Sequence, residues 1–280
     1  MTDCAVLEDR KIIRIKGADA VPFLQGIVTC DVDHLAPGEA AFGALLTPQG
    51  KIMFDFFLIR TEEGFLADAP AQLADDLAKR LGFYKLRAKV EIERDEACRV
   101  TAFWGGEPTD AGGITVRDPR HNELGWRQYG KEAAADCAGD YDAHRIELGV
   151  PQGGSDFAYG DAFPHDALMD EMNAVAFTKG CFIGQEVVSR MRHRGTARKR
   201  VVMIEADAPL PGPHTPVTAG GKPAGETGSA SANRGLALLR LDRIKPALDE
   251  GADILAGDTP VCVALQPWVS FGWPADRGGD

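Results

Sequence analysis

The chain has 280 residues, of which 44% are hydrophobic and 26% charged, so it can bury a sizeable core in about two domains. Its formal net charge of −11 disfavours a protein that binds nucleic acid or an anionic membrane with its whole surface. No apolar run reaches the ~18 residues of a membrane span, and we expect no signal or transit peptide in residues 1–16.

The first part of the chain is predicted to mix strands and helices without regular alternation, which indicates an α+β fold. Alternating apolar residues and turn residues predict strands, and apolar residues at every third or fourth position predict helices. Predicted strands cover residues 11–15, 52–59, 64–67, 86–92, 99–104 and 125–129. Predicted helices cover residues 19–25, 71–81, 131–138 and 141–148.

The second part of the chain has a different texture. Residues 149–165 are rich in Gly, Pro and Ser, and they are predicted to form a long loop of the kind that is usually functional. Short strands separated by Gly and Pro turns then follow, which indicates a small all-β barrel. These strands are predicted at residues 200–206, 215–218, 236–241 and 261–265. We therefore predict two domains, an α+β region at residues 1–195 and a C-terminal β-barrel at residues 196–280.

The cysteines are scattered along the chain and include no C-x-x-C pair. They are Cys4, Cys30, Cys98, Cys137, Cys181 and Cys262. Without an export signal, this pattern predicts reduced thiols in a cytoplasmic protein rather than a disulfide framework. Spaced ligands for zinc or an iron–sulfur cluster are missing, so we expect no resident metal.

The densest motif is T-K-G-C-F-I-G-Q-E at residues 178–186. Two glycines bracket Cys181, Lys179 stands two residues before it, and a helix is predicted from Glu186. A nearby ammonium and a helix N-terminus favour a thiolate over a thiol, so we consider Cys181 and Lys179 candidate catalytic residues. The same pattern is compatible with a small buried side chain in a glycine turn.

This motif resembles the signature of the YgfZ-type folate-binding proteins. These proteins are relatives of the glycine-cleavage aminomethyltransferase, the T-protein, and act as iron–sulfur cluster assembly factors. The resemblance extends over residues 10–265, and Cys30 stands where that family usually has Asn. Besides the motif itself, it is carried by F-L-Q-G with T and D-V at residues 23–32, G-K with D at 50–55, L-R-A-K-V at 86–90 and R-I-E-L-G with P at 145–151.

The resemblance implies T-protein-like α+β lobes around a central folate site, plus a small C-terminal β-barrel. The cofactor would be tetrahydrofolate or a one-carbon derivative. The resemblance and the chemistry of folate together suggest a set of binding residues, namely Asp55, Arg145, Glu147, Gln185 and Arg190.

Two carboxylates in this set also have plainer explanations. A carboxylate inside the apolar run 52–59 is costly unless it is partnered, so Asp55 either binds a ligand or is a satisfied structural residue. Glu147 matches a pterin-contacting position of the resembled family, or it is an exposed helix charge.

A basic run follows the motif. It consists of Arg190, Arg192, Arg194, Arg198, Lys199 and Arg200. These cations could hold a polyglutamate tail, an acidic partner or RNA, or they could form a solvated charged face.

We interpret the chain as a tetrahydrofolate-binding accessory protein for the assembly or repair of iron–sulfur clusters, more an accessory factor than an enzyme. Its expected partners are iron–sulfur assembly proteins and client iron–sulfur enzymes, with no membrane partner. The alternatives are a folate-dependent one-carbon (aminomethyl or methyl) transferase and a tRNA-modification factor. Aminomethyl transfer needs no cysteine, so the motif around Cys181 favours the accessory role, and the net negative charge disfavours direct nucleic-acid binding.

Overall fold

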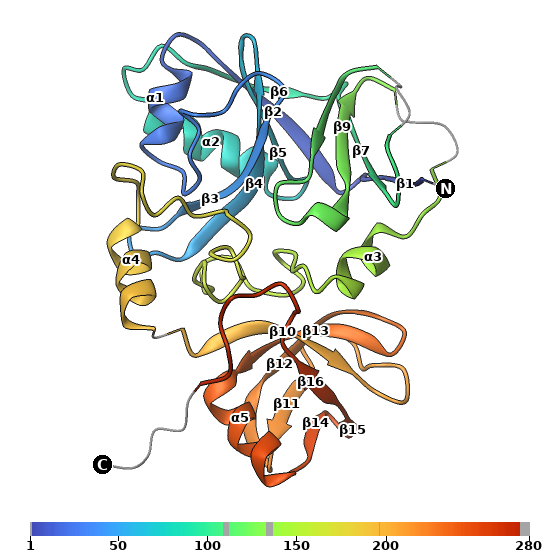
Figure 1. Ribbon diagram of the computed structural model, residues 1–280. Helices are drawn as coiled ribbons and strands as arrows, with labels where there is room; N and C mark the ends of the chain where they lie inside the picture. The colour runs from blue at the N-terminus through green and yellow to red at the C-terminus, as the bar shows by residue number, and fades with distance from the viewer. Residues whose placement is uncertain (1, 109–111, 133–136, 196, 275–280) are drawn as a thin grey trace. The chain divides into compact units, whose positions relative to one another are not determined.

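The computed structural model describes residues 2–108, 112–132, 137–195 and 197–274 (Figure 1). The chain forms two compact units, and each unit is built from two separate stretches of sequence. Unit 1 consists of Met1–Tyr141 and Met172–Ser189, and unit 2 consists of Asp142–Glu171 and Arg190–Asp280. Residues 142–171, which we predicted to belong with the N-terminal region, therefore fold with the C-terminal strands.

The larger sheet of unit 1 has five antiparallel strands in the order β3-β4-β5-β2-β6. Side chains of a strand alternate between the two faces of its sheet. Phe54, Phe56 and Leu58 on β4 accordingly join one apolar core, while Phe57 between them points to the opposite face. The strands are β2 (Arg10–Lys16), β3 (Ala40–Leu46), β4 (Ile52–Thr61), β5 (Gly64–Pro70) and β6 (Glu91–Asp95).

Two helices pack into that apolar core, α1 (Ala20–Gln25) and α2 (Ala74–Lys85) (Figure 1). Leu77 and Leu81 of α2 are one helical turn apart, and both are buried. The strand predicted at residues 86–92 is wrong at residues 86–90. The chain turns after α2, Leu86 is 85% exposed, and β6 begins only at Glu91.

The second sheet of unit 1 has the order β1-β7-β9-β8 and is also antiparallel. A short 3-10 helix (Asn122–Leu124) lies between its last two strands in the sequence. The strands are β1 (Asp3–Val6), β7 (Arg99–Trp104), β8 (Ile114–Arg117) and β9 (Trp126–Gly130). Of the helix predicted at residues 131–138, residues 133–136 lie outside the described residues, and the described remainder contains no helix.

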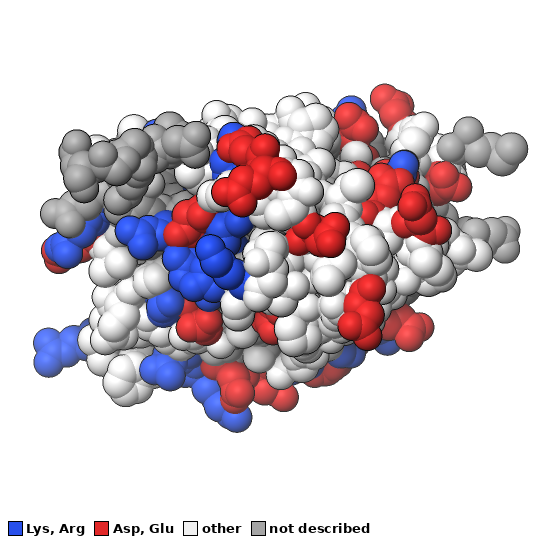
Figure 2. Space-filling view, turned by 90° about the horizontal axis from the view of Figure 1, so that it is seen from below, with Lys and Arg blue, Asp and Glu red and all other residues white. Residues whose placement is uncertain are grey.

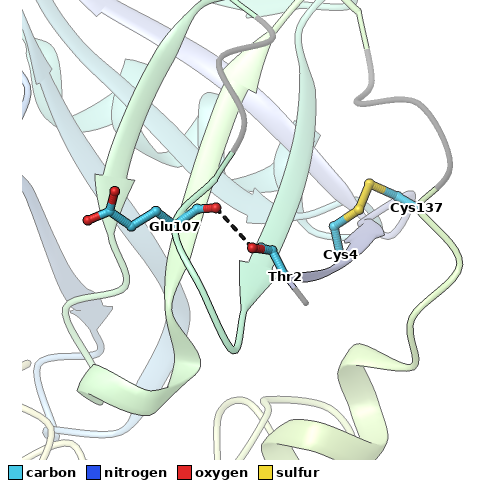
Figure 3. The surroundings of a disulfide bond; sticks show 4 residues. All are labelled: Thr2, Cys4, Glu107 and Cys137. Carbon is cyan, nitrogen blue, oxygen red and sulfur yellow. Dashed lines mark hydrogen bonds between the residues drawn. A yellow bond between two sulfur atoms is a disulfide. The ribbon is translucent and has the colours of Figure 1, made fainter.

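A disulfide joins Cys4 to Cys137 (Figure 3). This finding corrects the expectation that all the thiols are reduced. Ala5 forms an isolated β-bridge with Ala138, and the N–H of Gly139 donates to the carbonyl of Cys4 at 2.8 Å. Backbone pairing thus brings together two cysteines that are 133 residues apart, a proximity that the sequence does not signal.

Buried and partly buried charges join the two sheets of unit 1, and we call them the charged layer. Its members are Arg10, Asp68, Asp118, Arg120 and Arg127. The guanidinium of Arg127, on β9, donates to Asp68 on β5 and to Asp118, both at 3.0 Å. Arg120 donates to Asp118 at 2.8 Å, and Arg10 donates to Asp68 at 2.6 Å. Each carboxylate in this layer is therefore paired with more than one cation.

Unit 2 is built on one antiparallel sheet in the order β15-β14-β11-β12-β13-β10-β16. Its strands are β10 (Lys199–Glu205), β11 (Pro216–Ala219), β12 (Lys222–Ser231), β13 (Arg234–Arg240), β14 (Ile254–Ala256), β15 (Thr259–Pro260) and β16 (Cys262–Ala264). We expected strands alone in this unit, but it also contains a ten-residue helix, α5 (Leu241–Glu250). Its residues Leu241, Ile244 and Ala247 recur every three positions and are buried in the core of this unit.

Two further helices begin in unit 1 and end in unit 2, α3 (Tyr141–Glu147) and α4 (Gln185–Arg194). Both were predicted to within a few residues. The loop predicted at residues 149–165 contains no helix or strand, and irregular chain continues from there to α4. Among the described residues, no helix is long and apolar enough to cross a membrane.

Candidate functional site

The loop that carries the K-G-C motif, residues 178–184, is called the cysteine loop below. Lys179 anchors it to the segment that follows α1. Its ammonium donates to the carbonyls of Cys30 at 2.6 Å and Val28 at 2.8 Å, and to Gln25 Oε1 at 3.4 Å. The same ammonium lies 5.4 Å from the centre of the Phe182 ring, and burial lowers the pKa of Lys179 from its usual value. These contacts make Lys179 a positioning residue, and its catalytic role stays a prediction.

Two glycines fix the other end of the cysteine loop. Gly184 has a φ of +81°, and a Cβ there would lie 2.7 Å from the carbonyl oxygen of Thr47. Gly50 has a φ of +79°, and a Cβ there would lie 3.0 Å from Val187. Both conformations and both close approaches favour glycine, so the 47–50 turn and the end of the cysteine loop fit against each other.

Thr29 ties the segment before the cysteine loop to β3. Its hydroxyl donates to the carbonyl of Ala174 at 2.7 Å and accepts from the N–H of Ala44 at 2.8 Å. Its own carbonyl accepts from the N–H of Ala176 at 2.9 Å. The sequence marked Thr29 only as part of a resembling segment, because one of its partners, Ala174, lies 145 residues away.

Cys181 itself is exposed. The residue before it, Gly180, is also exposed, and a Cβ added there would meet no atom within 4 Å. Helix α4 begins at Gln185, shortly after the thiol, which agrees with the helix expected from Glu186. The alternative of a buried structural cysteine is therefore wrong for Cys181.

The other cysteines are placed differently. Cys30 is 1% exposed, and burial raises the pKa of its thiol to about 12. Burial also raises the pKa of Cys98 to about 11. Cys30 fills a space that is open because residue 43 is glycine, where a Cβ would lie 2.5 Å from its sulfur. With Cys4 and Cys137 joined, Cys181 and Cys262 are the exposed free thiols of the chain.

The residues predicted to bind folate fall in both units. Asp55 and Gln185 lie in unit 1, whereas Arg145, Glu147 and Arg190 lie in unit 2. Asp55 is 7% exposed and stands opposite Ala44 of β3, two residues before Phe57 and on the same face of β4. Gln185 is the first residue of α4.

The members in unit 2 have contacts of their own. Arg145 is 2% exposed, and it donates to Asp142 at 2.6 Å, to Asp156 at 3.0 Å and to Ser229 at 2.7 Å. It is thus an anchor within its unit. The side chain of Glu147 is 68% exposed and lies 3.6 Å from Arg234, as expected for an exposed helix charge. Folate contacts by these residues stay predictions.

The basic run is not uniform. Arg200 is buried and donates to Asp170 at 2.7 Å, with its guanidinium 4.2 Å from the centre of the Phe271 ring, so it holds unit 2 together. Arg192 and Arg198 are exposed.

Figure 2 shows one face of the molecule, on which Lys and Arg side chains gather in a group beside Asp and Glu side chains. Charges of both signs therefore share this face.

No group of three or more His, Cys, Asp or Glu residues within the described part of the chain could hold a metal ion. Any iron that reaches Cys181 would need ligands from another molecule as well, because the cysteine loop supplies a single thiol.

Comparison with known proteins gives the chain its relatives. It is 33% identical over 299 residues to "Iron-sulfur cluster assembly factor IBA57, mitochondrial" of Homo sapiens, and the match covers 92% of this chain and 84% of the human protein. The protein of the same name from Mus musculus is 31% identical over 284 residues, and the match covers 88% of this chain and 79% of the mouse protein. Residues 198–271 match the family described as "CAF17, C-terminal beta-barrel domain".

The fold is that of the T-protein. The crystal structure of glycine cleavage system aminomethyltransferase T from Bartonella henselae superposes with a TM-score of 0.73 at 17% identity. The superposition covers 96% of this chain and 86% of that protein. The expected T-protein-like fold with a C-terminal barrel is therefore confirmed.

Two expectations need correction. The named relatives are mitochondrial proteins, which contradicts the prediction of a cytoplasmic protein. The resemblance to the YgfZ-type proteins identified a related family, whereas the names of the relatives are those of IBA57. At 33% identity over 92% of its length, the chain belongs to the family of IBA57 iron–sulfur cluster assembly factors.

Proposed function

We propose that this protein is an iron–sulfur cluster assembly factor and that Cys181 is the thiol that handles iron or sulfur during assembly or repair. The observation that carries the proposal is the exposure of Cys181 on a loop that is fixed at both ends. Membership in the IBA57 family supplies the class of process. A soft thiolate is a natural ligand for iron and a nucleophile toward sulfur.

The rest of the cysteine loop serves to present this thiol. Lys179 and Gly184 fix the loop, and a side chain added at Gly180 would meet no other part of the chain within 4 Å. A single thiolate does not hold a cluster, so the contact with iron is transient and shared with an assembly protein or a client enzyme. Purified protein that carries a stable, stoichiometric cluster would contradict this account.

A deletion strain that lacks the protein provides the test. Cys181→Ala should fail to restore the activities of iron–sulfur enzymes, whereas Cys262→Ala should restore them. Cys262 is the matched control because it is the other exposed free thiol. Full restoration by Cys181→Ala would overturn the proposal.

Folate binding is a second candidate, favoured by Asp55. Asp55 is a buried carboxylate on β4, and its oxygens accept hydrogen bonds, which would suit the N–H donors of a pterin. Of the other predicted contacts, Arg145 is committed to its own unit and Glu147 is exposed, which leaves Asp55, Gln185 and Arg190 as candidate contacts.

The folate proposal is tested by thermal unfolding with tetrahydrofolate. A ligand that binds only the folded state stabilises it by about 2.7 kcal/mol at a hundredfold excess over Kd. We expect tetrahydrofolate to raise the Tm of the parent protein and to leave the Tm of Asp55→Asn unchanged. An unchanged Tm in the parent, with no heat in titration calorimetry, would remove folate from the account and leave the role of Cys181 standing.

The one-carbon transferase remains the rival enzyme. The likeness to an aminomethyltransferase at 17% identity supports the fold alone. A transferase would depend on Asp55 for proton transfer, typically worth about a hundredfold to ten-thousandfold in rate, and would tolerate Cys181→Ala. The deletion strain separates the two, because the accessory role depends on the cysteine.

A further inference from the structure

The end of helix α2 carries a surface that the cysteine loop does not explain. We call residues 79–89 the α2 surface. Phe83 is 71% exposed and Leu86 is 85% exposed, and with Leu248 they are the exposed large hydrophobic residues of the described chain. A single exposed apolar side chain is ordinary in proteins, but Phe83 and Leu86 stand three positions apart at one helix end.

Two backbone features of this surface lower the stability of the fold. Leu86 has a positive φ of +43° with a ψ of −104°, a backbone conformation that a leucine adopts only with strain. Gly82 lies inside α2, where alanine is the more stable choice, and a Cβ there would meet no atom within 4 Å. Neither the conformation of Leu86 nor the glycine inside α2 stabilises the fold. Backbone strain that persists in a folded protein often marks a functional site.

The α2 surface is positively charged. Its cations are Lys79, Arg80, Lys85, Arg87 and Lys89, and residues 79–89 contain no acidic residue. Lys79 pairs with Asp76, whereas no ion pair among the described residues engages the other four side chains. This unpaired positive charge stands in a chain with a net charge of −11.

We propose that the α2 surface docks an acidic partner protein, which presents an apolar side chain to Phe83 and Leu86 and carboxylates to the surrounding cations. The net charge of the chain favours a protein over an anionic membrane. A membrane is an extended charged plane that would repel the rest of this acidic chain, whereas a protein surface can confine its acidic residues to the patch. A second copy of the chain is disfavoured as the partner, because its own net charge of −11 would repel the rest of the first copy.

The open backbone at Gly82 suits this partner, because the partner can approach the helix closely there. The α2 surface uses none of the residues of the cysteine loop. Docking here would therefore add a partner site to the proposed role of Cys181, and each can fail without the other.

The test begins with benzoylphenylalanine in place of Phe83, followed by photocrosslinking in cells and identification of the crosslinked peptide by mass spectrometry. The captured protein is then purified, and its affinity for the full-length chain is measured by calorimetry at two salt concentrations. The variants are Leu86→Ser, Arg87→Glu and Gly82→Ala. Leu248→Ser is the control, because Leu248 is an exposed apolar residue on α5.

We expect a crosslink to an acidic segment of one partner, and binding that weakens with salt. Leu86→Ser and Arg87→Glu should each weaken binding at least tenfold, and Leu248→Ser and Cys181→Ala should stay within twofold. Gly82→Ala should weaken binding without lowering Tm, which separates docking from folding. Replacing the facing carboxylate of the partner by lysine should restore binding to Arg87→Glu.

The proposal is overturned by a crosslink to another copy of this chain, by a crosslink to no protein, or by unchanged binding of Arg87→Glu. Binding of the parent chain to vesicles of anionic phospholipid, lost in Arg87→Glu, would assign the surface to membranes and would equally overturn it.

Discussion

The charged layer and the cysteine loop lie in the same unit, but they differ in the burial and pairing of their polar groups. In the charged layer, Asp118 accepts hydrogen bonds from both Arg120 and Arg127 and is fully buried. In the cysteine loop, the polar anchor Lys179 is held by backbone carbonyls while the thiol of Cys181 is left exposed. Paired, buried charge specifies how two sheets meet, whereas an exposed thiol on a fixed loop is available for chemistry.

The largest expected effect is in the charged layer. Asp118→Asn removes the carboxylate charge that the buried cations Arg120 and Arg127 share. Breaking a buried pair in this way typically costs about 3–5 kcal/mol, measurable as a lower free energy of unfolding in urea. Asp76→Asn is the control, because its exposed pair with Lys79 should contribute about 1 kcal/mol at most. Equal losses in both variants would contradict a structural role for the charged layer.

Acid should weaken the protein through the same carboxylate. Burial alone would raise the pKa of Asp118, but the charges of Arg120 and Arg127 outweigh it and hold the pKa well below its usual value. A carboxylate with a depressed pKa stabilises the folded state fully above its unfolded pKa of about 3.9, and this stability is lost as the pH falls below that value. Urea unfolding from pH 7 to pH 3 should therefore show the parent protein and Asp118→Asn converging as the pH falls. A constant difference between them would show that Asp118 does not titrate as described.

Thiol reactivity should separate Cys181 from Cys30. Burial raises the pKa of Cys30 to about 12, so its thiolate is scarce at pH 7, and that sulfur is also buried. In the native protein, iodoacetamide should label Cys181 at least about a hundredfold faster than Cys30. Peptide mapping over time measures both rates, and labelling of Cys30 or Cys98 ahead of Cys181 would refute the choice of reactive thiol.

The smallest expected effects distinguish the two glycines of the motif. Gly184→Ala forces a side chain into a left-handed conformation beside the Thr47 carbonyl and should cost about 1–3 kcal/mol of stability. Gly180→Ala meets no neighbour and has no positive φ, so its effect on the free energy of unfolding should stay within about 1 kcal/mol. Thermal unfolding of both variants checks the pair. A greater loss for Gly180→Ala would mean that the cysteine loop is not held at residue 184.

Local patterns in the sequence predicted much of the fold. The strand at residues 99–104 was predicted with the bounds that β7 has, because alternation and turn residues lie within the strand itself. The same alternation misled at residues 86–92, since the turn after α2 exposes Leu86 instead of burying it. Helix α5 was missed because Pro246 inside it lacks the N–H of a regular helix and resembles a break between strands.

The candidate site was predicted in its residues but not in its contacts. The motif identified Cys181, while the target of Lys179 lies about 150 residues away in the sequence and has no local signal. Distance along the chain also hid the Cys4–Cys137 disulfide and the pairing of Asp68 with Arg127. The division of Asp55 and Glu147 between two units was invisible for the same reason, because a sequence does not state which segments fold together.

The most direct test of the central claim measures iron–sulfur enzyme activity per molecule of soluble protein in the deletion strain. Cys181→Ala and Asp118→Asn are expressed side by side in this strain. The account predicts that Cys181→Ala accumulates like the parent protein but restores no activity. It predicts that Asp118→Asn accumulates poorly and restores activity in proportion to its amount. Normal activity per molecule in Cys181→Ala would contradict the claim that this thiol performs the function of the protein.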